Sequence, residues 1–219
     1  MANSYLNRTT GSPTNSAIWT LSAWIKRSSL SGSQKFFAAG SSSTDRTEMY
    51  FAGNTGEFYI YRNISGSTIE LGSTRMFRDT SAWYNFVVQN NNGTVAVYVN
   101  GETVSMSNST SLGTNKINNA STAHYIGRQV ADTSQNFDGY MSHVSFVDGS
   151  VVAPTVFGET DSTSGIWKFK SPSGVTWGTN GFHLKFENSG ALGTDSSGNT
   201  NTFTVNGDLK QALDTPSNV

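Results

Sequence analysis

The sequence predicts an all-β fold, a sandwich or a closed barrel of short strands, and three observations predict it. Apolar and polar residues alternate with a period of two along many short runs, as they do in half-buried strands. Glycine, serine, threonine and asparagine separate these runs at intervals of roughly 8–15 residues. No long stretch shows the 3.6-residue periodicity and the end caps of a helix. Strands and turns therefore account for nearly the whole chain.

The first strand is predicted over residues 18–26, because apolar residues occupy every second position from Trp19 to Ile25. Short aromatic-rich runs predict the next strands, at residues 34–39, 48–52 and 57–62.

Two hairpins are predicted in the middle of the chain. Residues 83–89 and 94–99 are joined by an Asn-Gly turn that ends at Gly93, and a second Asn-Gly turn at residues 100–101 leads into a strand at 102–106. Asn-Gly favours hairpins because both residues tolerate a positive φ. Further strands are predicted at residues 123–126, 137–147, 166–169, 182–186 and 202–205.

We expect residues 1–219 to form a single β-sandwich domain. The one shift in composition is a turn-rich connector at residues 154–165. Only three strands are predicted after it, too few for an independent core, so we expect them to return to the same sandwich. The core can draw on 13 Phe, 8 Tyr and 5 Trp. By their pattern, the core residues include Trp19, Trp24, Trp83, Phe86 and Trp167.

The composition excludes several classes of partner. The formal net charge is −1, only 13% of residues are charged and no Lys/Arg cluster stands out, so nucleic-acid binding is not expected. The absence of cysteine excludes disulfides and thiolate chemistry. The first residues lack the apolar stretch of a secretory signal, and no apolar run approaches ~20 residues. We therefore expect synthesis in a cytosol and no membrane insertion.

Three segments resemble the laminin-G, or concanavalin-A-like, sandwich family. They are WTLSAWIK at residues 19–26, the Trp-to-Asn-Gly hairpin region at 83–101, and residues 125–146 with their central Phe-Asp-Gly at 137–139. The resemblance implies a jelly-roll sandwich of two antiparallel sheets. It also implies binding of glycans or proteins through loops or one sheet face, since many members of the family bind in this way; fold alone does not determine function.

The C-terminal third is similar to segments of virion proteins of tailed bacteriophages, especially marine ones. The similar segments are FGETDSTSGIW at 157–167, GTNGFHLKF at 178–186, DSSGN at 195–199 and DTPSNV at 214–219. This resemblance implies a protein made in the cytoplasm of a bacterial host and displayed on the virion surface. Its implied partners are other virion proteins of the capsid or the tail, with oligomeric or lattice assembly.

No catalytic residues are predicted. Sandwich glycosidases place two carboxylates on one strand face, at a spacing of two or four residues. The acidic residues here are scattered, and the only close pair, Glu159 and Asp161, lies in the turn-rich connector. Solvated loop charges explain that pair better than catalysis does. We expect a protein that is not an enzyme, with a sandwich glycosidase as a remote alternative.

Metal and cofactor sites are not predicted either. His124, His143 and His183 are isolated on predicted strands, without a partner at metal-ligand spacing. Asp195 and Asn199 offer the oxygen ligands that calcium prefers. The same residues are ordinary turn formers, and this structural interpretation is favoured, with calcium as the alternative.

Trp177 is the best candidate in the sequence for contact with a ligand or partner. It lies in a loop at residues 172–180, where its indole would stack on a sugar or on another protein. The rival interpretation, a lid that closes one end of the sandwich, is favoured.

These observations favour a non-enzymatic virion-surface structural protein, namely a head-decoration or knob-like protein that docks on other virion proteins. A tail fibre needs an elongated trimerising shaft, and the sequence has neither heptads nor collagen-like repeats. The alternative is the receptor-binding tip of a tail fibre or spike, which recognises glycans on the host surface. A lectin of this kind needs an open binding pocket, whereas a decoration protein needs a broad docking interface.

Overall fold

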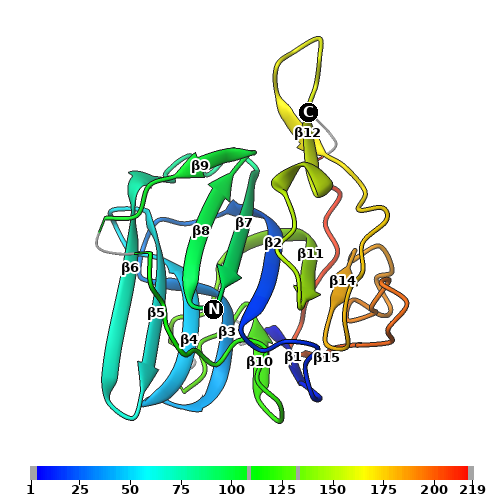
Figure 1. Cartoon of the computed structure of the whole chain (residues 1–219). Coiled ribbons are helices and arrows are strands. Elements are labelled where there is room, and N and C mark those ends of the chain that lie inside the picture. The colour runs from blue at the N-terminus through cyan, green and yellow to red at the C-terminus, as the bar shows by residue number, and fades with distance from the viewer. Residues whose placement is uncertain (1–3, 108–109, 132–133, 217–219) are drawn as a thin grey trace.

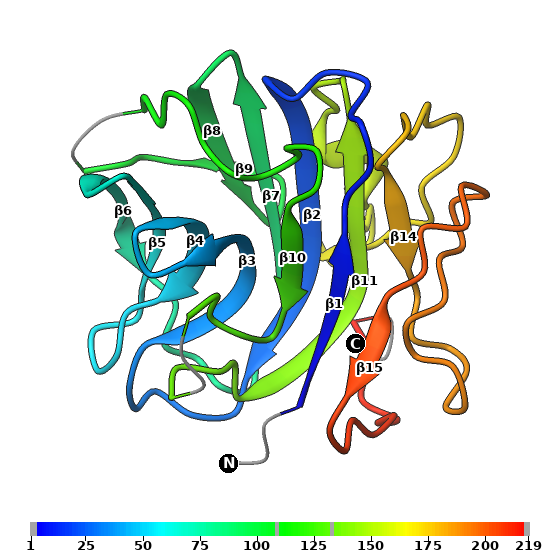
Figure 2. The ribbon, with the colours of Figure 1, turned by 90° about the horizontal axis from the view of Figure 1, so that it is seen from below.

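The computed structural model describes residues 4–107, 110–131 and 134–216. Its strands form two stacked antiparallel sheets (Figures 1 and 2), which confirms the predicted all-β jelly-roll sandwich. Sheet A contains, in spatial order, β15 (Thr204–Asn206), β1 (Tyr5–Thr9), β10 (Ala123–Ile126), β3 (Gln34–Ser42), β4 (Asp45–Phe51), β5 (Glu57–Ile64) and β6 (Ser67–Met76). Sheet B contains β14 (Phe182–Leu184), β11 (Gly139–Asp148), β2 (Ile18–Arg27), β7 (Tyr84–Asn91), β8 (Thr94–Val99) and β9 (Glu102–Val104).

The strands predicted from the sequence are all present, with bounds that differ by a few residues. Strands β1, β6 and β12 (Gly158–Thr160) were not predicted. In β1 and β6 the alternation is weak, because Leu6 and Leu71 are their only buried hydrophobic residues. The connector at residues 154–165 contains a short 3-10 turn, η1 (Pro154–Val156), and β12, which pairs with β13 (Trp167–Phe169).

Phenylalanine rings fill the space between the two sheets. Neighbouring rings have centroids 4.9–6.4 Å apart, at angles that favour edge-to-face and tilted contacts. An irregularity in β3 between Lys35 and Phe37 turns two consecutive phenylalanines, Phe36 and Phe37, toward the same core. The phenylalanine cluster consists of Phe36, Phe51, Phe58, Phe77 and Phe86.

The tryptophans do not all lie in this core, contrary to the sequence prediction. Trp19 does, stacked on Phe146 with ring centroids 6.0 Å apart. Trp24 is buried on the opposite, outer face of sheet B, where its Nε1 donates to the carbonyl of Phe157. Trp83 and Trp167 are only half-buried and lie outside the core. Strand alternation places Trp24 outside because its neighbours on either side point inward.

The segment between β11 and β14 covers the outer face of sheet B. Val87 and Val147 on that face form a second apolar cluster with Phe157. The Nε1 of Trp167 donates to the Oδ1 of Asn85 on β7 at 3.3 Å. A Cβ atom on Gly158 would lie 2.3 Å from that same nitrogen, so only glycine lets the hairpin close over the indole.

A column of stacked rings fastens this cover to sheet B. The rings of His143 on β11 and Phe169 on β13 stack with centroids 3.6 Å apart, and Trp177 stacks on His183 at 5.8 Å. The two histidines, isolated along the sequence, meet with Nδ1 of His143 3.3 Å from Nε2 of His183. Burial lowers the pKa of each to about 4, so both rings are neutral at neutral pH.

Buried Asp148, the last residue of β11, joins three loops at one end of the sandwich. Its Oδ1 accepts hydrogen bonds from the backbone N–H of Asn15 and the side-chain amide of Asn118, at 3.1 and 2.7 Å. Its Oδ2 accepts from the backbone N–H groups of Thr14 and Asn180, at 2.7 and 3.0 Å. Asn118 and Asn180 are buried with the carboxylate, and Thr14 and Asn15 lie at its edge, so this network holds the loop ends together.

We expect Asp148→Asn to destabilise the fold. The amide nitrogen that replaces one carboxylate oxygen would point its own N–H groups at two hydrogen-bond donors, which would then lose their acceptor. Each donor left unpaired in a buried site costs about 1–3 kcal/mol, so the loss in the free energy of unfolding should be about 3 kcal/mol. Urea unfolding followed by circular dichroism measures it. Asp208→Asn, at an exposed position, is the matched control and should change stability by less than about 0.5 kcal/mol. Equal unfolding midpoints in the two variants would contradict the structural role of Asp148.

The histidine pair predicts a loss of stability on mild acidification. The pKa of each ring is about 4 in the folded protein against an ordinary value of 6.5, so the unfolded chain binds more protons between those two values. The free energy of unfolding should therefore fall as pH is lowered from 6.5 toward 4. Urea unfolding at pH 7.5 and pH 5.5 measures the drop. It should be smaller in a His143→Gln, His183→Gln double variant, and an unchanged drop would refute this explanation.

Candidate functional site

The outer face of sheet A carries a row of half-buried tyrosines among charged side chains. On β5, Phe58 and Ile60 point into the core, so the residues that alternate with them, Tyr59 and Tyr61, point outward. Strands β3, β4 and β6 present polar and aromatic side chains on the same face. We call this set the tyrosine platform, and it consists of Lys35, Arg46, Glu48, Tyr50, Tyr59, Tyr61 and Glu70.

One line of the platform runs across three strands. Lys35, Tyr50 and Tyr59 are register partners on β3, β4 and β5. The Lys35 ammonium lies 4.0 Å from the centroid of the Tyr50 ring, and Tyr50 stacks on Tyr59 at 5.3 Å with 16° between the ring planes. The next register partner is Gly72, where a Cβ atom would lie 2.6 Å from Cε1 of Tyr59. Glycine at this position therefore makes room for the Tyr59 ring.

A second line runs parallel to the first and contains two carboxylates. Glu48, Tyr61 and Glu70 are register partners on β4, β5 and β6. The Arg46 guanidinium lies 5.3 Å over the Tyr61 ring. The Tyr50 hydroxyl donates to Glu70, and burial together with this carboxylate raises the pKa of Tyr50, so the phenol stays protonated. The platform is thus cross-linked between its two lines.

Of the two carboxylates, Glu48 is enclosed. Its side chain is 1% exposed, its Oε1 accepts the backbone N–H of Val130 at 3.2 Å, and its Oε2 lies 3.3 Å from Nε of Arg46. Burial raises the pKa of Glu48, while the charge of Arg46 acts in the opposite direction. Glu48 therefore anchors the loop that follows β10, and it is shielded from anything that contacts the platform.

The same face continues toward the other edge of sheet A. Tyr5 on β1 and Tyr125 on β10 have ring centroids 6.2 Å apart. The Arg128 guanidinium lies 4.5 Å from the Tyr5 ring and 5.4 Å from the Tyr125 ring. All three side chains are half-buried. Tyrosine and arginine therefore recur on both sides of the loop that Glu48 anchors.

The structure places the residues singled out in the sequence elsewhere. Trp177 is half-buried and packs on the outer face of sheet B, against the cluster that contains Phe157. Glu159 and Asp161 lie on the β12–β13 hairpin, where both face Lys168. None of these residues adjoins the tyrosine platform, because sheets A and B turn their outer faces in opposite directions.

The oxygens of Asp195 already have protein partners. Oδ1 accepts the N–H groups of His183 and Ser197, and Oδ2 accepts the N–H of Asn201 and the hydroxyl of Ser197, at 2.8–2.9 Å. The Asn199 amide donates to two backbone carbonyls, at 2.7 and 3.0 Å. Among the described residues no three His, Cys, Asp or Glu side chains gather as a metal site would need, and no helix is long and apolar enough to cross a membrane.

Analysis of the sequence missed the platform, because its members are neighbours across strands rather than along the chain. The available signal was the alternation Tyr59-Ile60-Tyr61, in which a core residue separates two aromatic residues that must face away from the core. Nothing in the sequence states that Tyr50 pairs with Tyr59 or that Glu48 pairs with Tyr61, because register is decided by the turns between the strands.

Comparisons with solved structures find the same architecture in several proteins. A protein from Bacteroides ovatus ATCC 8483 described as a candidate carbohydrate-binding protein matches with a TM-score of 0.61 and 17% identity, over 98% of this chain and 59% of its own. A heptameric SAP-like pentraxin from Limulus polyphemus matches with a TM-score of 0.55 and 15% identity, over 80% of this chain and 82% of its own. The CBM40 domain of the Ruminococcus gnavus IT-sialidase matches with a TM-score of 0.52 and 13% identity, over 68% and 92%.

These identities are low, so the likeness concerns the fold alone, and this chain spans about three fifths of the length of the Bacteroides ovatus protein. No curated protein sequence matches the chain. The sequence profile of the concanavalin A-like lectin/glucanase superfamily matches residues 2–157, well over half of the chain. The chain therefore belongs to the concanavalin A-like lectin/glucanase superfamily.

Proposed function

We propose that this chain is a non-catalytic carbohydrate-binding domain and that the tyrosine platform is its contact face. The observation that carries the proposal is the line of tyrosines across adjacent strands, flanked by Lys35, Arg46 and Glu70. A sugar ring has an apolar C–H face that packs on an aromatic ring, and hydroxyls that exchange hydrogen bonds with charged and phenolic groups. The platform offers both kinds of contact within one surface.

The platform is also held rigid before any ligand arrives. Tyr50 is fixed by the Lys35 ammonium on one side and by the Tyr59 ring on the other, and its hydroxyl is bound to Glu70. Gly72 lets the Tyr59 ring settle over β6. Side chains that are already ordered lose little conformational entropy on binding, so more of the contact energy appears as affinity.

The environment of Glu48 supports a binding role rather than hydrolysis. A glycosidase needs two carboxyl groups that reach opposite sides of a glycosidic bond. Glu48 and Glu70 flank Tyr61, but the Glu48 carboxylate is enclosed by Val130 and Arg46. In this proposal Glu70 and the tyrosines orient the sugar, and no proton transfer to it takes place.

We propose in addition that this domain is displayed on the virion surface of a tailed bacteriophage and is made in the cytoplasm of the bacterial host. The support is the similarity of the C-terminal third to virion-protein segments, among them residues 157–167 and 178–186. Within that setting, the tyrosine platform favours a receptor-binding tip that recognises host-surface glycans. The sequence alone favoured a head-decoration protein, and the platform reverses that order.

The decoration role remains the second candidate, and one observation favours it. Tyrosine and arginine are enriched at protein–protein interfaces, and Tyr5, Tyr125 and Arg128 extend the same face toward the edge of sheet A. A capsid partner would cover this broad surface. The number of copies per particle separates the two roles, since a decoration protein matches the number of capsid lattice positions and a tail tip does not.

We expect the isolated domain to bind glycans saturably on a glycan array. Tyr59→Ala or Tyr61→Ala should lower its affinity for the best-binding glycan at least tenfold, a loss of about 1.4 kcal/mol in binding free energy. The reason is the loss of the ring surface that packs on the sugar. Isothermal titration calorimetry with that ligand gives the affinity. Tyr61→Phe keeps the ring and should retain most of the binding, and Tyr140→Ala, at an exposed tyrosine outside the platform, should retain all of it.

Two further outcomes bear on the proposal. Calcium should leave the affinity unchanged, because the Asp195 oxygens are already bound by backbone and hydroxyl donors. Incubation with the ligand should release no free sugar. Absence of glycan binding across the array, or sugar release that Glu70→Gln abolishes, would refute the non-catalytic carbohydrate-binding role.

A further inference from the structure

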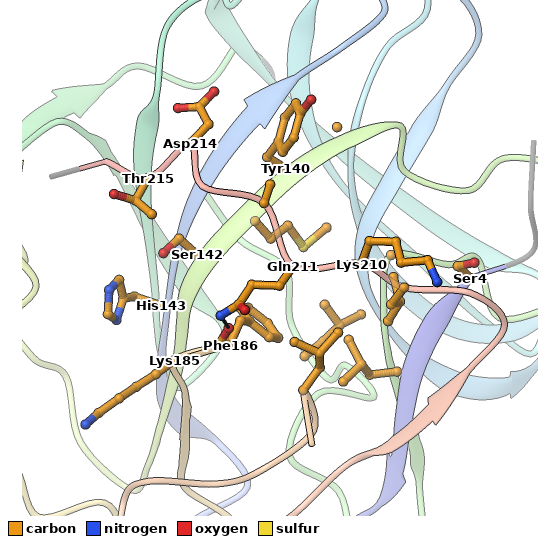
Figure 3. Close-up of a pocket in the computed structure, with 18 of the residues that line it drawn as sticks. Ser4, Tyr140, Ser142, His143, Lys185, Phe186, Lys210, Gln211, Asp214 and Thr215 are labelled. Atoms are coloured by element: carbon orange, nitrogen blue, oxygen red, sulfur yellow. Dashed lines mark hydrogen bonds between the residues drawn. The ribbon is translucent and has the colours of Figure 1, made fainter. Parts of the chain in front are cut away.

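A separate cavity lies where the two sheets part, at the edge next to β11. Strand β14 pairs with β11 only at residues 144–146, so residues 139–143 extend beyond it. Across from that stretch lie β1 and β10 of sheet A. The space between them is a cavity of about 410 Å³, over which the C-terminal residues 209–215 pass (Figure 3). We call it the tail cavity.

Part of the wall of the tail cavity is apolar, and the rest is polar. The apolar side chains include Leu6, Ile126, Phe137, Met141, Leu192 and Leu209. Leu6 and Ile126 belong to the main core, and Phe137, Met141 and Leu209 pack against it. An engineered cavity of about 150 Å³ lined by apolar side chains alone stays dry and binds benzene or xenon. The tail cavity is larger than that, so an apolar body would gain hydrophobic contact by entering it.

The charges around the mouth of the cavity cancel in pairs. Lys185 lies 3.7 Å from Glu187, and Figure 3 shows its side chain pointing away from the cavity. The Lys210 ammonium lies 2.5 Å from Asp208, and Asp214 lies 2.7 Å from Lys26. An ionic ligand would leave water here without gaining an uncommitted counter-charge, which is unfavourable.

Uncharged polar groups also line the cavity. Burial lowers the pKa of His143 to about 4, so its ring is neutral at neutral pH. The Gln211 amide spans the cavity mouth and donates to the carbonyls of Phe186 and Glu187, both at 3.0 Å. Ser142, the residue before His143 on β11, also lines the cavity. A hydroxyl or amide head group can exchange hydrogen bonds with such groups without carrying a charge.

We propose that the tail cavity is a second binding site and that its ligand is an uncharged amphiphile, with an aliphatic or small aromatic body and a hydroxyl or amide head. The apolar part of the wall favours the body, the uncharged polar part favours a hydroxyl or amide head, and the paired charges at the mouth disfavour an ionised head. The proposal is independent of the tyrosine platform, which lies on the outer face of sheet A, whereas this cavity opens between the sheets.

Three linear eight-carbon probes with different head groups test the proposal: 1-octanol, octanoate and octylamine, each titrated calorimetrically into the purified domain at pH 7.5. We expect saturable binding of 1-octanol, with an affinity at least tenfold higher than that of either ion. The reason is that an ionised head group would lose its hydration at the mouth, where the charged side chains are already paired. Leu209→Phe places a larger side chain in the cavity and should lower the affinity for 1-octanol at least tenfold. Val205→Phe, at an exposed position of β15 that does not line the cavity, is the matched control and should bind like the parent protein.

Unfolding midpoints of both variants verify that they fold. Failure of 1-octanol to saturate the domain would overturn the proposal, as would octanoate or octylamine binding as tightly as the alcohol. Unchanged affinity in Leu209→Phe would overturn it too. Glycan binding by the same variants keeps the two sites apart: Leu209→Phe should leave it intact, and Tyr59→Ala should leave 1-octanol binding intact.

Discussion

Alternation along each strand is the constraint on which the rest of this structure depends. A strand that buries Phe58 and Ile60 must turn Tyr59 and Tyr61 to the opposite face, because successive side chains point to opposite sides of a sheet. The packed phenylalanine core therefore positions the tyrosine platform without any contact between the two. A one-residue slip of β5 would exchange core and platform, and the burial of the phenylalanines opposes that slip.

The same constraint acts on sheet B with a different outcome. Trp24 and Val87 point outward from β2 and β7, yet both are buried, because the chain between β11 and β14 folds back over them. The aromatic residues of that segment, Trp167 and Trp177, are used in this cover. One outer face of the sandwich is thus closed by the protein itself, whereas the outer face of sheet A keeps half-buried tyrosines and charged groups within reach of solvent. Binding is expected on the open face.

The chain has few charged residues, and several of its carboxylates organise loops. Asp148 and Asp195 each accept four hydrogen bonds from backbone and side-chain donors; those to Asp148 come from three loops that are distant in sequence, and those to Asp195 come from residues within twelve positions of it. Glu48 does the same for the loop after β10. A carboxylate whose lone pairs are filled in this way stabilises one loop arrangement. Glu70, in contrast, accepts the Tyr50 hydroxyl at the exposed surface of the platform, within reach of the proposed ligand.

The sequence by itself determined the fold class, most of the strands and the superfamily, because strand alternation and Asn-Gly turns act over a few neighbouring residues. It could not foresee β1 and β6, since strands with one buried hydrophobic residue each leave almost no periodic signal. Only the tertiary structure decided the platform, the histidine pair and the tail cavity. Glu48, Tyr61 and Glu70 become neighbours through strand register, and Leu6 and Leu209 line one cavity because β1 pairs with β15. Both are long-range consequences of strand pairing that no local pattern contains.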